Sequence, residues 1–204
     1  MNGINKLTIF RILLIPIVIW LMYANFGHNT AWALGVFLLS SLAAWFGENI
    51  AKSPNQTTTL DKLISPLATK LLVTAALIVF VDWGFSGIPM IIIISCEMLV
   101  TGLRFAATSQ SKEIEPSFWD KLNTVVQVVM IAVVLFAVSN PATAAHIGPY
   151  RGTFITRGDM DTFTFAVVYA VRILIYVMLA ATVISSISYV QRNRELLENK
   201  AGGQ

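Results

Sequence analysis

The sequence predicts an all-α integral membrane protein with six transmembrane helices and both termini in the cytoplasm. The chain is 56% hydrophobic and only 12% charged, whereas a soluble domain carries roughly 25% charged residues. Its apolar residues also occur in runs of about 18 or more with few charges, which is typical of membrane-spanning helices. We expect residues 1–204 to form a single membrane domain.

The apolar runs divide the chain into the expected spans. We expect these spans at about residues 9–26, 31–51, 66–83, 88–107, 122–139 and 162–187. Pro16 falls inside the first span, where a membrane helix tolerates proline because neighbouring groups satisfy the freed backbone. Gly84, Gly87 and Pro89 predict a tight turn between the third and fourth spans. A longer polar loop, 141–161, precedes the last span.

The lysines and arginines predict the orientation of the chain. With the N-terminus inside, 11 of the 14 basic residues fall on the inner side. Only Arg151 and Arg157 fall outside, and Arg172 lies within the last span. Because cytoplasmic loops carry an excess of lysine and arginine, we expect a multi-pass membrane protein with both termini inside. Anionic headgroups account for this basic balance, and no basic-aromatic pattern indicates a nucleic-acid partner.

The cysteine and histidine residues further limit the kinds of site that the chain can contain. The single cysteine, Cys96, excludes an intramolecular disulfide and a cysteine cluster for metal. His28 and His146 fall in short loops, where a histidine is more often solvated than a ligand, and we assign neither a role. The first apolar run has no small-residue cleavage site, so we expect no cleavable signal.

One stretch, residues 44–70, has the frame of a phosphotransferase site. It reads AWFGENIAKSPNQTTTLDKLISPLATK and joins two apolar helices through a polar hinge. It resembles the signature of the CDP-alcohol phosphotransferase family, D-x2-D-G-x2-A-R-x8-G-x3-D-x3-D. With Ala51 as the family's alanine, the aspartate positions hold Ala44, Gly47, Ser65 and Thr69, the glycine positions hold Glu48 and Asp61, and the arginine position holds Lys52.

The resemblance implies a reaction that this stretch is poorly equipped to perform. In the family, an alcohol attacks the pyrophosphate of a CDP-linked lipid and CMP leaves. Such phosphoryl chemistry depends on positioning and on divalent cations, and magnesium or manganese requires hard oxygen ligands, above all carboxylates. Every carboxylate of the pattern is replaced here. We therefore expect no metal cofactor and no catalytic residue.

The alternative is a metal site built from carboxylates at other positions. Glu48 adjoins one lost aspartate position, Asp61 shares a helix face with two others, and Glu97 lies inside the fourth span. An intramembrane carboxylate is usually functional, so these three side chains are candidates for a weaker metal site. The other interpretation is that Glu48 and Asp61 are solvated or paired with lysines of the hinge, Lys52 and Lys62. In that case Glu97 pairs with Arg104 or a backbone donor.

The resemblance extends from residue 5 to about 197 and points to the phosphatidylglycerophosphate synthase branch. The similar segments are NKLTIFRILLIPI (5–17), SPLATKLLVTAALI (65–78), CEMLVTGLR (96–104), FWDKLNTVVQ (118–127) and the tail 188–196. Asp120 and Asn123 stand where that branch usually has glycine and lysine. The resemblance implies a six-helix bundle and a tendency to form homodimers, since small residues allow close helix packing. Packing within one subunit is the other interpretation of those residues.

Some residues on the substrate side of the family's site are retained in this chain. The resemblance implies that Asn5, Thr8 and Arg11 lie in the N-terminal substrate motif, and Lys52, Arg104 and Lys121 place cations near the cytoplasmic cavity. These residues predict a pocket for phosphate, an anionic phospholipid or CDP-diacylglycerol. Ordinary anchoring of lysine and arginine side chains at the inner leaflet is the alternative.

Three functions follow, in order of preference. The first is a catalytically degenerate homologue that binds lipid or a partner membrane protein. The second is an active CDP-diacylglycerol–glycerol-3-phosphate phosphatidyltransferase of phospholipid biosynthesis with a rebuilt site at Glu48, Asp61 and Glu97. The third is a scaffold or transport-complex subunit that uses the helical body as a membrane platform.

Overall fold

The computed structural model describes residues 3–50, 59–108, 118–141, 143–144 and 161–192, with side chains described in all but 3–7, 48–50, 59–66 and 108. Long α-helices make up this part of the chain. They are α1 (Gly3–Tyr23), α2 (Asn29–Ile50), α3 (Thr59–Asp82), α4 (Gly87–Thr108), α5 (Phe118–Ser139) and α7 (Thr162–Arg192). The prediction of an all-helical chain is confirmed within these residues.

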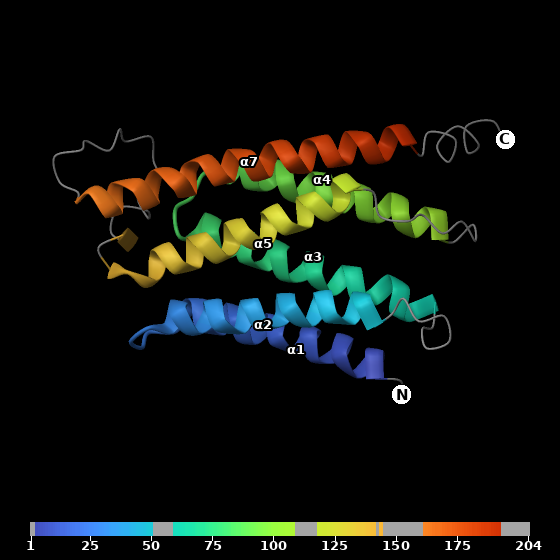
Figure 1. The fold of residues 1–204 in the computed structure, drawn as a ribbon, viewed down its shortest axis with the longest axis horizontal. Helices are drawn as coiled ribbons and strands as arrows, with labels where there is room; N and C mark the ends of the chain where they lie inside the picture. The colour runs from blue at the N-terminus through green and yellow to red at the C-terminus, as the bar shows by residue number, and fades with distance from the viewer. Residues whose placement is uncertain (1–2, 51–58, 109–117, 142, 145–160, 193–204) are drawn as a thin grey trace.

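The helices run along one another as a single elongated bundle (Figure 1). The α1–α2 pair forms one side and the α4–α7 pair the other, with α3 and α5 between them. The start of α1 and the end of α7 lie at the same end of the bundle, together with the ends of α2 and α4. We call this the hinge end, because α2 and α3 both approach residues 51–58 there.

Most of the helices are longer than the apolar runs that predicted them. α3 begins at Thr59 rather than near residue 66, and α7 continues to Arg192 rather than ending near 187. A hydropathy run marks only the part of a helix that suits hydrocarbon, whereas backbone hydrogen bonds continue through polar residues.

Four helices contain stretches that are long and apolar enough to cross a membrane. Within the described residues these stretches are Asn29–Gly47, Gly87–Ala107, Phe118–Ser139 and Thr162–Arg192, and Thr8–Tyr23 is a shorter apolar stretch. Large apolar side chains project from the bundle, with Trp20 and Trp32 each 64% exposed and Ile88 72% exposed. Such an apolar exterior suits lipid rather than water. The count of six spans and the orientation stay predictions.

The core runs through the middle of the bundle. Phe37 from α2, Phe80 from α3, Met130 and Leu135 from α5, and Met178 from α7 are fully buried and belong to one cluster. Each of these helices contributes apolar side chains to the same interior, so packing rather than propensity sets their arrangement.

The predicted turn between α3 and α4 is present and closes α3 with a specific cap. Gly84 has a φ of 96°, its N–H donates to the Val81 carbonyl at 3.0 Å, and the Phe85 N–H donates to the Phe80 carbonyl at 3.0 Å. The rings of Phe80 and Phe85 pack at 5.5 Å between centroids. This is a Schellman cap with its hydrophobic contact. Pro89 falls in the first turn of α4, where a helix needs no donor.

The cap generates a stability prediction. Gly84→Ala is expected to lower the free energy of unfolding by about 1–2 kcal/mol, because a Cβ disfavours the left-handed conformation. Gly35→Ala is the matched control, since Gly35 lies within α2 with nothing within 4 Å of an added Cβ, and it should be neutral or stabilising. Thermal unfolding of both variants in detergent measures the difference. Equal midpoints would contradict the role of the cap.

Candidate functional site

The motif positions lie in the parts of α2 and α3 that approach the hinge end. Ala44 and Gly47, near the end of α2, are both buried. Thr69 lies on α3, one residue before Lys70, and is partly buried. Ser65 belongs to α3, but its side chain lies outside the described residues, as do those of Glu48 and Asp61. The described motif positions therefore bring two small residues and one hydroxyl to the site.

Arg11 connects α1 to the last motif position. Its guanidinium Nη2 donates a hydrogen bond to Thr69 Oγ1, and the side chains of Arg11 and Thr8 are 3% and 5% exposed. Arg11 and Thr8 sit on one face of α1, three residues apart, so both project toward the interior. At this position a cation and a neutral hydroxyl meet inside the bundle.

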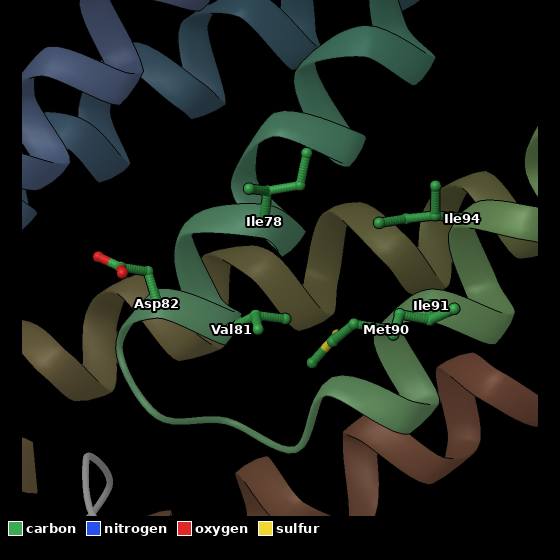
Figure 2. Close-up of a pocket in the computed structure, with 6 residues that line it drawn as sticks. All are labelled: Ile78, Val81, Asp82, Met90, Ile91 and Ile94. Carbon is green, nitrogen blue, oxygen red and sulfur yellow. The ribbon is translucent and has the colours of Figure 1, made fainter.

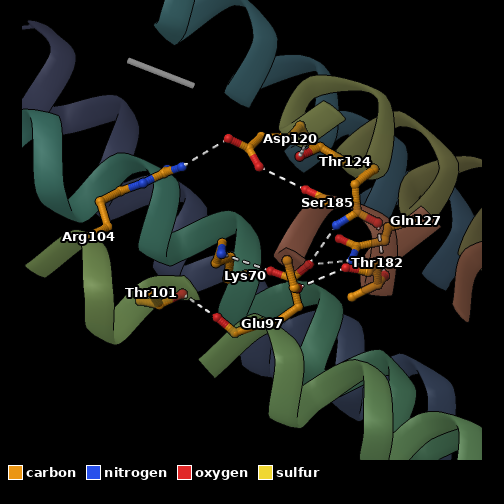
Figure 3. Close-up of polar contacts among 11 residues, drawn as sticks. Lys70, Glu97, Thr101, Arg104, Asp120, Thr124, Gln127, Thr182 and Ser185 are labelled. Atoms are coloured by element: carbon orange, nitrogen blue, oxygen red, sulfur yellow. Dashed lines mark hydrogen bonds and ion pairs between the residues drawn. The ribbon is translucent and has the colours of Figure 1, made fainter. Parts of the chain in front are cut away.

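Glu97 is the centre of a polar cluster in the middle of the bundle (Figure 3). One carboxylate oxygen, Oε2, lies 2.8 Å from the Lys70 ammonium. The other, Oε1, accepts hydrogen bonds from Asn123 Nδ2 and Gln127 Nε2, each at 2.7 Å. Thr182 on α7 completes the cluster by donating to Asn123 Oδ1 at 2.8 Å. We call these five residues the Glu97 cluster.

The Glu97 cluster satisfies a charge that would otherwise be costly. A carboxylate removed from water must be paired and hydrogen-bonded to be tolerated, and Glu97 is 7% exposed. Its donors come from α3 and α5, and the bond from Thr182 adds α7. Four helices, with α4 carrying Glu97 itself, are thereby joined by polar bonds within an apolar body.

A second cluster lies two turns further along α4, toward the hinge end (Figure 3). Arg104 Nη2 is 3.7 Å from Asp120 Oδ2, and the Arg104 guanidinium lies over the Tyr189 ring at 5.7 Å from its centroid. The other carboxylate oxygen, Asp120 Oδ1, accepts a hydrogen bond from Ser185 Oγ at 2.8 Å. We call these four residues the Arg104 cluster.

The residues that the sequence predicted to bind substrate lie in different parts of the bundle. Thr8 and Arg11 lie inside the bundle beside the motif, and Arg104 lies in the second cluster. Lys121 is exposed on α5. The Asn5 side chain and all of Lys52 lie outside the described residues.

The prediction of the ion-pair partner of Glu97 was wrong. Arg104 or a backbone donor was predicted, but Glu97 pairs with Lys70, and Arg104 faces Asp120. Glu97 and Arg104 are seven residues apart on one helix, which separates them by about 10 Å along its axis. Neighbouring helices therefore supply the partners of both residues.

Sequence reasoning missed the amide and hydroxyl residues that complete the clusters. Asn123 and Gln127 are four residues apart in an otherwise apolar helix, and Thr182 and Ser185 are three apart in another. Such spacings place each pair on one helix face. Polar pairs on one face of an apolar helix were the available signal, because polar groups in membrane helices face the protein interior.

The side chains that the structure describes at the motif positions offer no carboxylate to the divalent cation that the family resemblance implies. Ala44 has no side-chain oxygen, Gly47 has no side chain, and the Thr69 hydroxyl is bonded to Arg11. Among the side chains that the structure describes, no three His, Cys, Asp or Glu residues come together as a metal site. Hard cations bind through anionic oxygen, and the described anionic oxygens of Glu97 already face protein donors.

A groove of about 370 Å³ lies between α3 and α4 beside their connecting turn (Figure 2). Its lining residues are Ile78, Val81, Asp82, Met90, Ile91 and Ile94. It is about two turns of α3 from Lys70. An almost wholly apolar lining does not suit a pyrophosphate, so this groove is separate from the motif site.

The fold and the clusters define a helical membrane protein whose polar residues face its interior. The model of the CDP-alcohol phosphatidyltransferase family matches residues 1–155. The chain belongs to this family.

Similar proteins indicate which branch of the family this chain resembles. A Bacillus subtilis protein is 29% identical over 208 residues, covering 95% of this chain and 96% of its own length. A Wigglesworthia glossinidia brevipalpis protein is 30% identical over 61% of this chain and 71% of its own length, and a Rickettsia typhi protein is 34% identical over 64% and 74%. All three are named CDP-diacylglycerol–glycerol-3-phosphate 3-phosphatidyltransferase. The predicted resemblance to the phosphatidylglycerophosphate synthase branch is confirmed.

The Glu97 cluster generates a second prediction. Lys70→Met leaves a buried carboxylate without its counter-charge and should destabilise the protein by about 3–5 kcal/mol. Lys70→Met combined with Glu97→Gln removes both charges, while the glutamine oxygen still accepts from the Asn123 and Gln127 amides. The double variant should therefore recover much of the loss.

Thermal unfolding in detergent measures Lys70→Met, Glu97→Gln and the double variant. Lys121→Met is the matched control, because Lys121 is exposed, and it should change stability by less than about 1 kcal/mol. A double variant as unstable as the sum of the two single variants would contradict coupling between Lys70 and Glu97.

Proposed function

We propose that this chain is a catalytically silent member of its family that binds an anionic phospholipid headgroup and does not transfer a phosphatidyl group. In this proposal, residues 1–204 form one six-helix domain in a bacterial cytoplasmic membrane, with both termini cytoplasmic. The shared end of α1 and α7 in the bundle (Figure 1) supports termini on one side of the membrane. The excess of lysine and arginine on that side supports a cytoplasmic location.

The observation that carries the proposal is the charge at the motif. Where the family pattern has aspartates, the described positions hold Ala44, Gly47 and Thr69. Thr69 accepts a hydrogen bond from the cation Arg11 and precedes the cation Lys70 in the chain. A pair of metal ions requires anionic ligands to hold it. Thr69 also has no proton-accepting state near neutral pH that would make it a general base.

Lipid binding follows from the same cations. Arg11 and Arg104 are basic residues on the inner faces of α1 and α4, and both are at most partly exposed. Relatives are named for a reaction on CDP-diacylglycerol, an anionic lipid. A chain that keeps cations facing the lipid phosphate and lacks carboxylates for the metal retains binding without chemistry.

An active transferase is the second candidate, because the relatives' names favour it. It requires metal ligands from Glu48, Asp61 and Glu97. Glu97 would then have to exchange the Lys70 ammonium and two amide donors for a cation. That exchange leaves Lys70 buried without its partner, so the first proposal is preferred.

The two candidates differ in product formation. The purified full-length chain, given CDP-diacylglycerol, glycerol 3-phosphate and Mg²⁺ or Mn²⁺, should release no CMP above a protein-free blank, because phosphoryl transfer needs the anchored cations. The Bacillus subtilis relative, assayed in parallel, is the positive control. CMP release by this chain that disappears in Glu48→Ala or Asp61→Ala would establish the active alternative and overturn the proposal.

The proposed orientation has its own test. In a Cys96→Ser background, Lys200→Cys should react with a membrane-impermeant maleimide only after the cells are permeabilised, because the C-terminus is cytoplasmic. Arg151→Cys, in the predicted outer loop, is the matched variant and should react in intact cells. Labelling of both positions, or of neither, in intact cells would refute the six-span topology.

A further inference from the structure

The proposed function makes no use of the groove between α3 and α4. The groove has a volume of about 370 Å³ and lies beside the turn that joins these helices, at the end of the bundle opposite the hinge end (Figure 2). Its lining is apolar except for Asp82, the last residue of α3. Ile78 and Ile91 in that lining are 57% and 63% exposed, so the groove opens on the outside of the bundle. In a membrane protein, an apolar outer surface faces lipid.

Asp82 stands at the edge of this groove. Figure 2 shows its carboxylate turned away from Ile78 and the other apolar side chains. Asp82 is exposed, and the Tyr23 hydroxyl of α1 donates a hydrogen bond to it. A hydroxyl is neutral, and within the described part of the chain no lysine or arginine forms an ion pair with Asp82. The negative charge at the edge of the groove is therefore not balanced by a described cation.

The residues around Asp82 indicate that it lies at the depth of lipid headgroups. Trp83 follows it in the chain and packs against Phe80, with 5.7 Å between ring centroids, and Tyr23 reaches it from α1. Tryptophan and tyrosine are enriched where a membrane meets water, because their rings are apolar and their N–H and O–H groups are polar. Ile78 lies one turn deeper on α3, about 6 Å along the axis. The apolar part of the groove is thus at the level of acyl chains.

We propose that this groove binds an acyl chain of a phospholipid whose headgroup carries a primary amine, and that the ammonium of the headgroup pairs with Asp82. A lining of isoleucine, valine and methionine suits a hydrocarbon chain, and the carboxylate attracts the ammonium at headgroup depth. The same carboxylate repels a headgroup that carries a net negative charge. The site is independent of the anionic headgroup binding proposed above, which concerns cations nearer the other end of the bundle.

Reconstitution of the full-length protein in vesicles of phosphatidylethanolamine and phosphatidylglycerol in equal amounts tests this proposal. Bromine on the acyl chains of one of the two lipids quenches the tryptophans that this lipid touches. The quenching due to Trp83 is obtained by comparison with Trp83→Phe. It should be about threefold greater with brominated phosphatidylethanolamine than with brominated phosphatidylglycerol, which is the preference expected of a solvated ion pair. Asp82→Asn should remove this preference, because it removes the charge and little else. Asp161→Asn changes another exposed carboxylate, is the matched control and should retain the preference.

The results distinguish the possible occupants of the groove. Equal quenching of Trp83 by the two lipids, or a preference that survives in Asp82→Asn, would overturn the proposal. Absence of Trp83 quenching by either lipid would also overturn it, and would indicate a groove closed to lipid, as by a second copy of the chain. Asp82→Lys is a second variant and should reverse the preference toward phosphatidylglycerol, which keeps the proposal testable if Asp82→Asn does not fold.

Discussion

The structure depends on how one buried carboxylate is neutralised. Glu97 sits in the middle of α4 with little exposure, and both of its oxygens are engaged, one by the Lys70 ammonium and one by two amides of α5. Removing such a charge from water is tolerated only with a partner and hydrogen bonds. Because those partners come from other helices, satisfying Glu97 also sets how α3, α4 and α5 face one another, and the Thr182 bond extends this constraint to α7.

The need to neutralise buried charge also bears on the proposed function. Family chemistry requires carboxylates that gather metal ions around a pyrophosphate, and the described motif positions of this chain offer an alanine, a glycine and a threonine bonded to Arg11. The charges that remain inside the bundle are mostly paired between protein groups: Lys70 with Glu97, and Arg104 opposite Asp120. The first pair is tight and deep, whereas the second is long and partly exposed.

Much of the fold was predictable from the chain's one-dimensional pattern. Each expected span coincides with one observed helix, and Gly84 predicted the turn in which it adopts its left-handed conformation. Helix ends were less predictable, as the start of α3 at Thr59 illustrates, because polar residues continue a helix that hydropathy alone would end. Among the residues predicted to bind substrate, Thr8 and Arg11 are buried, Arg104 is partly buried and Lys121 is exposed, and their role in binding stays a prediction.

The sequence by itself determined the membrane character, the helical elements and the family, since these follow from apolar runs, turn residues and the order of motif segments along the chain. Only the tertiary structure decided which polar groups meet. Arg104 is nearer to Glu97 in sequence than Asn123, Gln127 or Lys70, yet a helix rises about 1.5 Å per residue and holds residues seven apart too far from each other to pair. Packing brings α3 and α5 against Glu97 instead. Which polar groups pair inside a bundle depends on which helices lie next to each other. That arrangement is set by packing contacts throughout the core.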